Sequence, residues 1–153
     1  MRFTKLLFAT LVVGILLFAV HAEADIKPGV RVGAYFDPTD AFVGGEILVD
    51  VAPRWWFNPN VEYVFVDEAT FLTFNFDVHY DLPVRDFYFW VGGGLGIAYF
   101  DPKPRRFASD TDLGLNVFAG IGFKTNSRIV PYIQPKVFIS DDSEFSLAFG
   151  IRF

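Results

Sequence analysis

Residues 145–153 read Phe145-Ser146-Leu147-Ala148-Phe149-Gly150-Ile151-Arg152-Phe153. Large apolar side chains occupy every second position, and small or polar side chains occupy the positions between them. Successive side chains of a β-strand point to opposite faces, so this period of two indicates a strand over 144–153 with one wholly apolar face. That face consists of Phe145, Leu147, Phe149, Ile151 and Phe153.

The same alternation recurs between residue 26 and this strand. In residues 70–81, for example, Leu72, Phe74 and Phe76 alternate with polar side chains. Apolar positions do not recur three and four residues apart, so helices are disfavoured, and the Gly, β-branched and aromatic residues favour strands. The sequence therefore predicts eight strands, at 26–36, 42–51, 55–66, 70–81, 87–100, 112–124, 129–140 and 144–153.

The first 24 residues differ from the rest of the chain. Arg2 and Lys5 precede an apolar run over 6–20 that only Thr10 interrupts. This run is shorter than the roughly 18–20 residues of a spanning helix, and small residues follow it. The pattern predicts a secretory signal peptide, 1–24, cleaved after Ala22 or Ala24, rather than an uncleaved membrane anchor. The predicted domain, 25–153, has no second apolar run long enough to span a bilayer as a helix.

The composition narrows the class of protein. Of 153 residues, 52% are hydrophobic and 20 are Phe, which is unusual for a soluble domain of this size. A formal net charge of -5 disfavours a nucleic-acid partner. The absence of Cys excludes disulfides and thiolate metal sites. The glycines at 92–94 and 96 precede another strand pattern, whereas a phosphate-binding loop requires a following helix.

Alternation alone does not say which face of the sheet looks inward. An eight-stranded barrel is only just wide enough for the side chains inside it, so it cannot hold so many Phe, Tyr, Leu and Ile. An apolar face that points outward requires lipid, where the sheet must close to satisfy every backbone polar group. The sequence thus predicts an all-β fold, a closed antiparallel up-and-down transmembrane β-barrel of eight strands. A soluble lipocalin-like barrel, with the apolar face inside, is the alternative.

The chain resembles the small outer-membrane β-barrel superfamily that includes OmpA-, OmpX- and OmpW-like proteins. The resemblance covers essentially all of 25–153 and rests on the signal peptide and on three strand segments, 90–99, 118–123 and 149–153, which read WVGGGLGIAY, FAGIGF and FGIRF. In that superfamily a C-terminal aromatic strand is the signal that the barrel-assembly machinery reads. The resemblance implies this role for Phe145, Leu147, Phe149, Ile151 and Phe153. The short loops of this chain depart from the family pattern.

The polar face would line the lumen of such a barrel. Because burying a charge is costly unless it is paired, we expect an internal ion-pair network. Glu62 and Asp77, on adjacent strands, should lie near Lys136, Arg31 or Arg152. A gate or ion path is one interpretation, and a plug that fixes the strand register is the favoured one. The expected members are Arg31, Glu46, Glu62, Asp77, His79, Lys136 and Arg152, with Asp50 and Glu144 on the same face.

His79 is the only His in the predicted domain. With Asp77 or Asp81 it could form a general base, as in the lipid A deacylases and palmitoyltransferases that are eight-stranded barrels. Those deacylases have a Ser two residues after the His, where this chain has Asp81. The palmitoyltransferases begin with an amphipathic helix, for which residues 25–28 leave no room. We therefore expect no enzymatic activity and no catalytic, cofactor-binding or metal-binding residue.

The two ends of the barrel should differ in charge. Connections at 37–40, 67–68, 101–111 and 141–143 are mostly acidic, whereas those at 53–54, 83–86 and 125–128 are basic. The acidic loops suit divalent cations that bridge lipopolysaccharide, although solvated loops are the simpler interpretation. Aromatic girdles are expected at both ends. Their members would be Trp55, Trp56, Phe87, Tyr88 and Trp90 at the basic, periplasmic end and Tyr35, Tyr99 and Phe100 at the other.

These patterns favour a non-enzymatic integral outer-membrane β-barrel of a Gram-negative envelope, exported through the Sec pathway. It would have a filled polar lumen and a structural or surface-interaction role. The expected partners are outer-membrane lipid, lipopolysaccharide and, during biogenesis, the barrel-assembly machinery, and the protein is expected to be a monomer. The alternatives are a soluble periplasmic lipocalin-like carrier of an apolar ligand and a narrow channel.

Overall fold

The computed structural model describes residues 25–36, 39–103, 109–141 and 143–153. The predicted signal peptide, 1–24, lies outside these ranges. In the described part of the chain, every regular element is a β-strand. The strands are β1 (Ile26–Phe36), β2 (Thr39–Ala52), β3 (Trp55–Val64), β4 (Ala69–Leu82), β5 (Phe87–Pro102), β6 (Asp110–Phe123), β7 (Val130–Ile139) and β8 (Glu144–Arg152).

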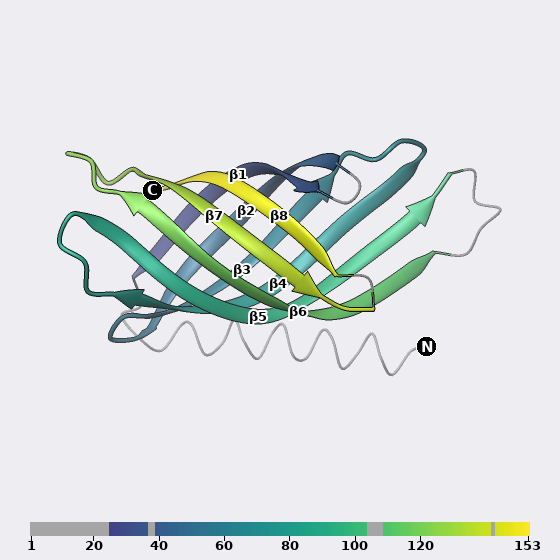
Figure 1. Cartoon of the computed structure of the whole chain (residues 1–153). Helices are drawn as coiled ribbons and strands as arrows, with labels where there is room; N and C mark the ends of the chain where they lie inside the picture. The colour runs from purple at the N-terminus through teal and green to yellow at the C-terminus, as the bar shows by residue number, and fades with distance from the viewer. Residues whose placement is uncertain (1–24, 37–38, 104–108, 142) are drawn as a thin grey trace.

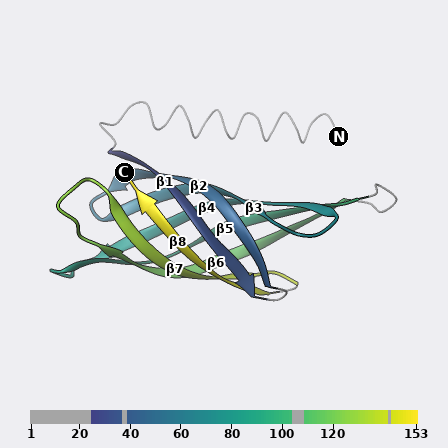
Figure 2. The same cartoon turned by 90° about the horizontal axis from the view of Figure 1, so that it is seen from above.

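The eight strands form one closed barrel (Figures 1 and 2). Each strand pairs antiparallel with the next one along the chain, and β1 pairs antiparallel with β8 from Gly29↔Arg152 to Tyr35↔Ser146. The ladder therefore has no free edge. The predicted all-β, antiparallel, up-and-down barrel of eight strands is confirmed.

The observed strands differ from the predicted ones mainly at their ends. β2 begins at Thr39 rather than at residue 42, because Phe36↔Thr39 and the next pairs extend the β1–β2 ladder almost to the turn. β6 likewise begins at Asp110, where it pairs with Phe100 of β5. Cross-strand hydrogen bonds in these hairpins continue into polar segments that show no alternation.

The first and the last strand place the two ends of the described chain, Asp25 and Phe153, at the same end of the barrel. We call this the terminal end: β1 begins there and β8 ends there, on the left of Figure 1. The turns at 53–54, 83–86 and 124–129 also lie there, and they carry Arg54, Arg85 and Arg128. The β3–β4 and β5–β6 hairpins project beyond the other strands at the opposite end (Figure 1). No helix in the described residues is long and apolar enough to cross a bilayer.

The two faces of the sheet differ sharply in chemistry. Large apolar side chains point outward and are exposed on all eight strands, among them Val32, Val43, Val61, Phe74, Leu95, Leu115, Val117, Val137 and Phe149. The interior instead buries charged and amide side chains together with a few aromatic rings. This arrangement is the reverse of a soluble lipocalin-like barrel, whose apolar face lies inside.

Glycines on the inner face make room for the interior aromatic rings. A Cβ atom at Gly120 would overlap the indole of Trp90, and one at Gly150 would overlap the ring of Tyr132. Neither glycine has a positive φ angle, so space rather than backbone conformation requires glycine at these positions. The glycines of β6 and β8 thus allow a narrow barrel to hold large rings from the neighbouring strands β5 and β7.

Candidate functional site

Glu62 is the hub of the interior charge network. Its carboxylate lies 3.0 and 3.1 Å from Lys136 Nζ and 3.5 Å from Arg31 Nε. Tyr35 donates its hydroxyl to Glu62 at 2.5 Å, and Thr73 donates at 3.0 Å. These groups come from β1, β3, β4 and β7, so one carboxylate ties together four strands around the lumen.

Asp77 binds amides rather than a cation. Asn60 donates to one carboxylate oxygen at 3.0 Å, and Asn116 donates to the other at 2.8 Å. Asn75 bridges the two, because it donates to Asn60 at 2.9 Å and accepts from Asn116 at 2.8 Å. Asp77 was expected near Lys136, Arg31 or Arg152, and Lys136 and Arg31 lie close enough for their charges to act on it, but the hydrogen bonds to its carboxylate come from Asn60 and Asn116. Two amide side chains, from β3 and β6, thus satisfy this carboxylate, and a third, from β4, links them.

A second ion pair lies nearer the terminal end. Arg152 Nε donates to Glu46 at 2.9 Å. The guanidinium carbon of Arg152 lies 4.4 Å from the ring centroids of both Trp90 and Tyr132. The Trp90 indole N–H donates to Gln134 at 2.9 Å. A cation between two aromatic faces is further stabilised by their quadrupoles.

The interior charges balance in sign. In the described part of the chain, the buried cations are Arg31, Lys136 and Arg152, and the buried carboxylates are Glu46, Glu62 and Asp77. All six lie on the inner face that the alternation assigned to the lumen, and so does His79. Asp50 and Glu144 are only half-buried, closer to the two ends of the barrel.

His79 points into the barrel and not toward the outer face. Its side chain is 1% exposed, and its ring lies 5.6 Å from the Trp90 ring, tilted by 33°. His79 Nε2 lies 3.6 Å from Asp81 Oδ1, which is too long for a hydrogen bond, while Trp56 donates to Asp81 at 2.9 Å. Asp77 and Asp81 were the two carboxylates considered as partners of His79, and Asp81 is the one that lies beside its ring.

Several aromatic side chains lie away from the girdles expected for them. Trp90 and Tyr35 are buried inside, and Trp56 and Tyr88 line a cavity at the terminal end. The girdle assignment was thus wrong for the buried Trp90 and Tyr35, although the strand alternation already put Trp90 on the same face as Gly92 and Gly94. Exposed aromatic side chains that fit the girdles are Trp55, Phe87 and Phe100, while Tyr99 is half-buried.

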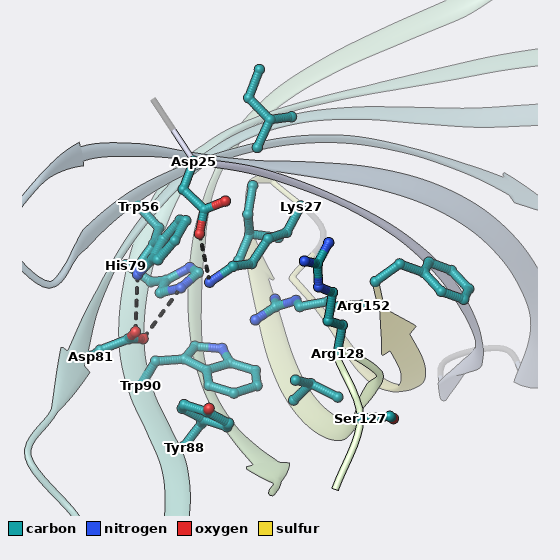
Figure 3. Close-up of a pocket in the computed structure, with 14 residues that line it drawn as sticks. Asp25, Lys27, Trp56, His79, Asp81, Tyr88, Trp90, Ser127, Arg128 and Arg152 are labelled. Atoms are coloured by element: carbon teal, nitrogen blue, oxygen red, sulfur yellow. Dashed lines mark hydrogen bonds and ion pairs between the residues drawn. The ribbon is translucent and has the colours of Figure 1, made fainter. Parts of the chain in front are cut away.

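The barrel is plugged toward the opposite end and open at the terminal end. Tyr35, Phe42, Val64 and Ala148, from the neighbouring strands β1, β2, β3 and β8, form a buried apolar cluster inside the barrel. The small hollow beside them, lined by Asn116 among others, has a volume of about 10 Å³, which is roughly the space of one water molecule. At the terminal end, in contrast, a cavity of about 490 Å³ lies among His79, Asp81 and Arg152 (Figure 3).

The sequence did not indicate several residues that complete the interior. Thr73, Asn75, Asn116 and Gln134 are buried hydrogen-bond partners. The sequence places these four residues on the polar face of their strands. Because their side chains are uncharged, however, burying them does not require a partner of opposite charge, so they were not singled out. Within the described ranges, no group of three or more His, Cys, Asp or Glu side chains is placed to hold a metal ion.

The fold matches solved structures, although a scan against protein-family models and a search of curated proteins find no match. The N-terminal β-barrel domain of Pseudomonas aeruginosa OprF aligns with a TM-score of 0.73 and 12% identity, over 86% of this chain and 98% of that one. Neisserial surface protein A (NspA) gives 0.64 and 8%, over 86% and 98%. The outer membrane enzyme PagL gives 0.57 and 12%, over 83% and 98%.

These similarities establish the fold. The chain has the eight-stranded architecture of small outer-membrane β-barrels, as the sequence resemblance implied. One of the matching proteins is named as an enzyme and another as a surface protein, so the fold does not by itself assign an activity.

Proposed function

We propose that this chain is a non-enzymatic, monomeric outer-membrane β-barrel of a Gram-negative envelope, exported through the Sec pathway, with a structural or surface-interaction role. The observation that supports it best is the orientation of the strands. Exposed apolar side chains surround a closed ladder whose interior holds a balanced set of charges.

The outer face is suited to hydrocarbon. Soluble monomers rarely expose contiguous apolar patches larger than a few hundred Å². Here Val32, Leu115 and Phe149 are each about half exposed, and they belong to an apolar surface that every strand contributes to. Outer-membrane lipid and lipopolysaccharide are the partners that fit this surface, and the alternating apolar face of β8 is the segment proposed for recognition by the barrel-assembly machinery.

The filled lumen supports a structural role over a channel. A conducting pore needs a continuous aqueous path, whereas the side chains of the Glu62 hub are buried and the hollow beside Tyr35 and Lys136 has a volume of about 10 Å³. Planar-bilayer recordings of the purified protein should show no steady conductance. Reproducible unitary currents would favour the narrow-channel alternative.

The position of His79 argues against an enzyme that modifies lipid A. A lipid A-modifying enzyme must bring its base to an acyl chain, and His79 is enclosed by the barrel wall. Mass spectrometry of lipid A should give the same species with the wild type and with His79→Ala. A species that depends on His79 would identify an enzyme.

Membrane fractionation tests the central proposal. The protein should stay in the membrane pellet after a sodium carbonate wash and be released only by detergent. An unheated sample should also migrate differently from a boiled one in detergent gels, because a closed ladder resists unfolding. Release by carbonate together with a single unchanged band would contradict the proposal.

A further inference from the structure

The turns at the terminal end form a basic surface. The turns between β2 and β3, between β4 and β5, and between β6 and β7 contain one carboxylate, Asp86, and four cationic side chains, Arg54, Arg85, Lys124 and Arg128. All four cations are exposed, and none has a carboxylate within 4.0 Å among the described residues. A surface of this sign attracts anions.

Arg54 lies beside two aromatic rings on the outer side of this surface. Its Nη1 atom lies 3.5 Å from the hydroxyl oxygen of Tyr80. Tyr80 is the register partner of Trp55, and the two ring centroids are 5.1 Å apart. Trp55 is exposed, and Tyr80 lies on the outer face of β4 with the exposed Val78. Arg54, Trp55 and Tyr80 thus form one outward-facing group, which we call the Arg54 cluster.

The Arg54 cluster lies where the apolar outer face of β3 ends. Toward the middle of the barrel, the next residues on the same face are Phe57 and Val78, which are again register partners. In the other direction, β3 is preceded by the turn residues Pro53 and Arg54. In a membrane barrel, Trp and Tyr side chains at such a boundary lie at the level of the lipid headgroups. The guanidinium of Arg54 would therefore lie at the level of the lipid phosphates.

The backbone of Arg54 would suit glycine better than arginine. Its φ angle is 69°, in the left-handed region that residues with a Cβ atom enter only at a cost. Glycine or asparagine is the usual residue at a turn position that follows Pro and has a positive φ angle. The carbonyl of Arg54 accepts from the N–H of Asp81 at 2.8 Å, a contact that glycine could also make. The reason for an arginine therefore lies in its side chain.

The donors of the Arg54 cluster suit a phosphodiester. A guanidinium can donate two parallel hydrogen bonds to phosphate oxygens. The Tyr80 hydroxyl faces the guanidinium as an acceptor and keeps its own proton, so it can donate to the same phosphate. The rings of Trp55 and Tyr80 offer apolar contact to the glycerol and upper acyl region of a lipid. Inorganic phosphate carries the same oxygens but offers these rings nothing to pack against.

We propose that the Arg54 cluster binds the headgroup phosphate of an anionic phospholipid in the leaflet that surrounds the terminal end. This inference rests on the proposed membrane location of the barrel and adds to it one class of lipid and one binding position. The other turn cations would increase the local concentration of anionic lipid through their longer-range attraction, which salt screens.

Native mass spectrometry of the barrel in dodecyl maltoside, a detergent without phosphate, tests the proposal with phosphatidylglycerol as the probe. Diacylglycerol with the same acyl chains is the matched lipid control, because it lacks only the phosphoglycerol headgroup. The barrel should retain phosphatidylglycerol about fivefold more than diacylglycerol, as expected for exposed hydrogen bonds to a charged group. Equal retention of the two lipids, or displacement of phosphatidylglycerol by an excess of inorganic phosphate, would overturn the proposal.

Three variants locate the binding position. Arg54→Gly removes the guanidinium, and Tyr80→Phe removes only the hydroxyl group. Each should reduce the retention of phosphatidylglycerol about threefold. Arg85→Gly is the matched control, because it removes an exposed turn arginine at the same end and should leave retention unchanged. Equal losses for Arg54→Gly and Arg85→Gly would show an effect of net charge alone and exclude the Arg54 cluster as the site.

Urea unfolding in the same micelles gives a readout that a purely structural role of Arg54 would not change. Without phospholipid, Arg54→Gly should be more stable than the wild type, because glycine adopts a positive φ angle without strain. Added phosphatidylglycerol should raise the unfolding midpoint of the wild type and of Arg85→Gly but not that of Arg54→Gly, since only a bound lipid stabilises the folded state. An equal increase in all three proteins would contradict the proposal.

Carbonate extraction of the same proteins tests the membrane location separately. The wild type and both arginine variants should remain in the membrane pellet, because their apolar outer face is unchanged. A wild type that stays in the pellet but retains both lipids equally would overturn the phosphate site alone. Release of the wild type by carbonate would overturn the membrane location and this inference with it.

Discussion

Trp90 shows how a single side chain shapes the interior. Its indole is 1% exposed, donates to Gln134, and packs against Tyr132, His79 and Arg152. These contacts are possible only because the facing position on β6 is Gly120, where a Cβ atom would overlap the indole. The glycine and the tryptophan therefore form one packing unit across the β5–β6 pair.

This unit leads to a prediction for Gly120→Ala. The added methyl group overpacks a buried ring that cannot move into solvent, so the variant should lose about 1–3 kcal/mol of unfolding free energy. Urea unfolding in lipid vesicles measures the loss. Gly45→Ala is the matched control, because a Cβ atom at this position on β2 would have no neighbour within 4 Å. Equal stabilities of the two variants would show that Trp90 does not fill the lumen as described.

The Glu62 hub gives a second prediction. Glu62→Gln leaves Lys136 and Arg31 in the interior without the carboxylate that both contact. Removing one partner of a buried ion pair typically costs about 3–5 kcal/mol. Urea unfolding under the same conditions should show a loss of this order. Asp67→Asn, at an exposed turn, is the control and should stay within about 0.5 kcal/mol of wild type. A loss below about 1 kcal/mol for Glu62→Gln would mean that water screens the hub.

The sequence predicted which side chains enter the lumen, but only in part which of them meet: Glu62 was expected near Lys136, Arg31 or Arg152, and it contacts Lys136 and Arg31. Alternation within a strand assigns a face without reference to other strands, so Arg31, Glu62 and Lys136 were correctly placed inside. The partner of a side chain depends on the register between strands, which no single strand encodes. The alternation therefore did not indicate that Asp77, expected near Lys136, Arg31 or Arg152, would accept hydrogen bonds from Asn60 and Asn116.

Each strand combines a face for the surroundings with a face for the lumen. On β6, Leu113, Leu115 and Val117 are exposed, whereas Gly114, Asn116 and Phe118 are buried. This period of two made the number and approximate position of the strands predictable. Strand ends were less predictable, because hairpin pairing near Thr39 and Asp110 continues where the alternation stops.

The outer face of β6 provides a test of the surroundings. Val117→Arg places a charge on the outer face near the middle of the barrel height, where it should cost about 2–4 kcal/mol in a bilayer. Thr111→Arg, near the start of the same strand, should cost about 0–1 kcal/mol. Unfolding titrations in lipid vesicles compare the two. In a water-soluble barrel an arginine at the exposed Val117 position would be harmless, so equal stabilities would contradict the membrane assignment.

For the whole molecule, the interior network and the closed ladder constrain each other. A one-residue slip of any strand would exchange its two faces, moving lumen charges to the outer face and forcing large apolar side chains into the lumen. The balanced set of three buried cations and three buried carboxylates is complete only in the observed register. Because the strands run alternately up and down, their connections fall at the two ends in turn. This order places the basic turns at the terminal end and the acidic side chains of Asp67, Glu68, Asp101 and Asp141 at the other end.

Closure itself can be measured, because the chain contains no native cysteine. Val32 of β1 and Phe149 of β8 are register partners on the outer face. Partners in an antiparallel ladder have Cα atoms about 4.5–5.5 Å apart, within the roughly 4.4–6.8 Å that a disulfide spans. The double variant Val32→Cys/Phe149→Cys should therefore cross-link on mild oxidation and shift in a boiled, non-reducing gel.

The matched control places the second cysteine on a strand that β1 does not contact. Val32→Cys/Leu115→Cys should remain uncross-linked within one molecule, because β1 pairs only with β2 and β8. If the first pair failed to cross-link, or if both pairs did so equally, β1 and β8 would not be neighbours and the sheet would be open. An open sheet would leave the backbone groups of two strands unpaired in hydrocarbon, at several kcal/mol for each group. The cross-link therefore tests both the topology and the physical reason why such a strand set can reside in lipid.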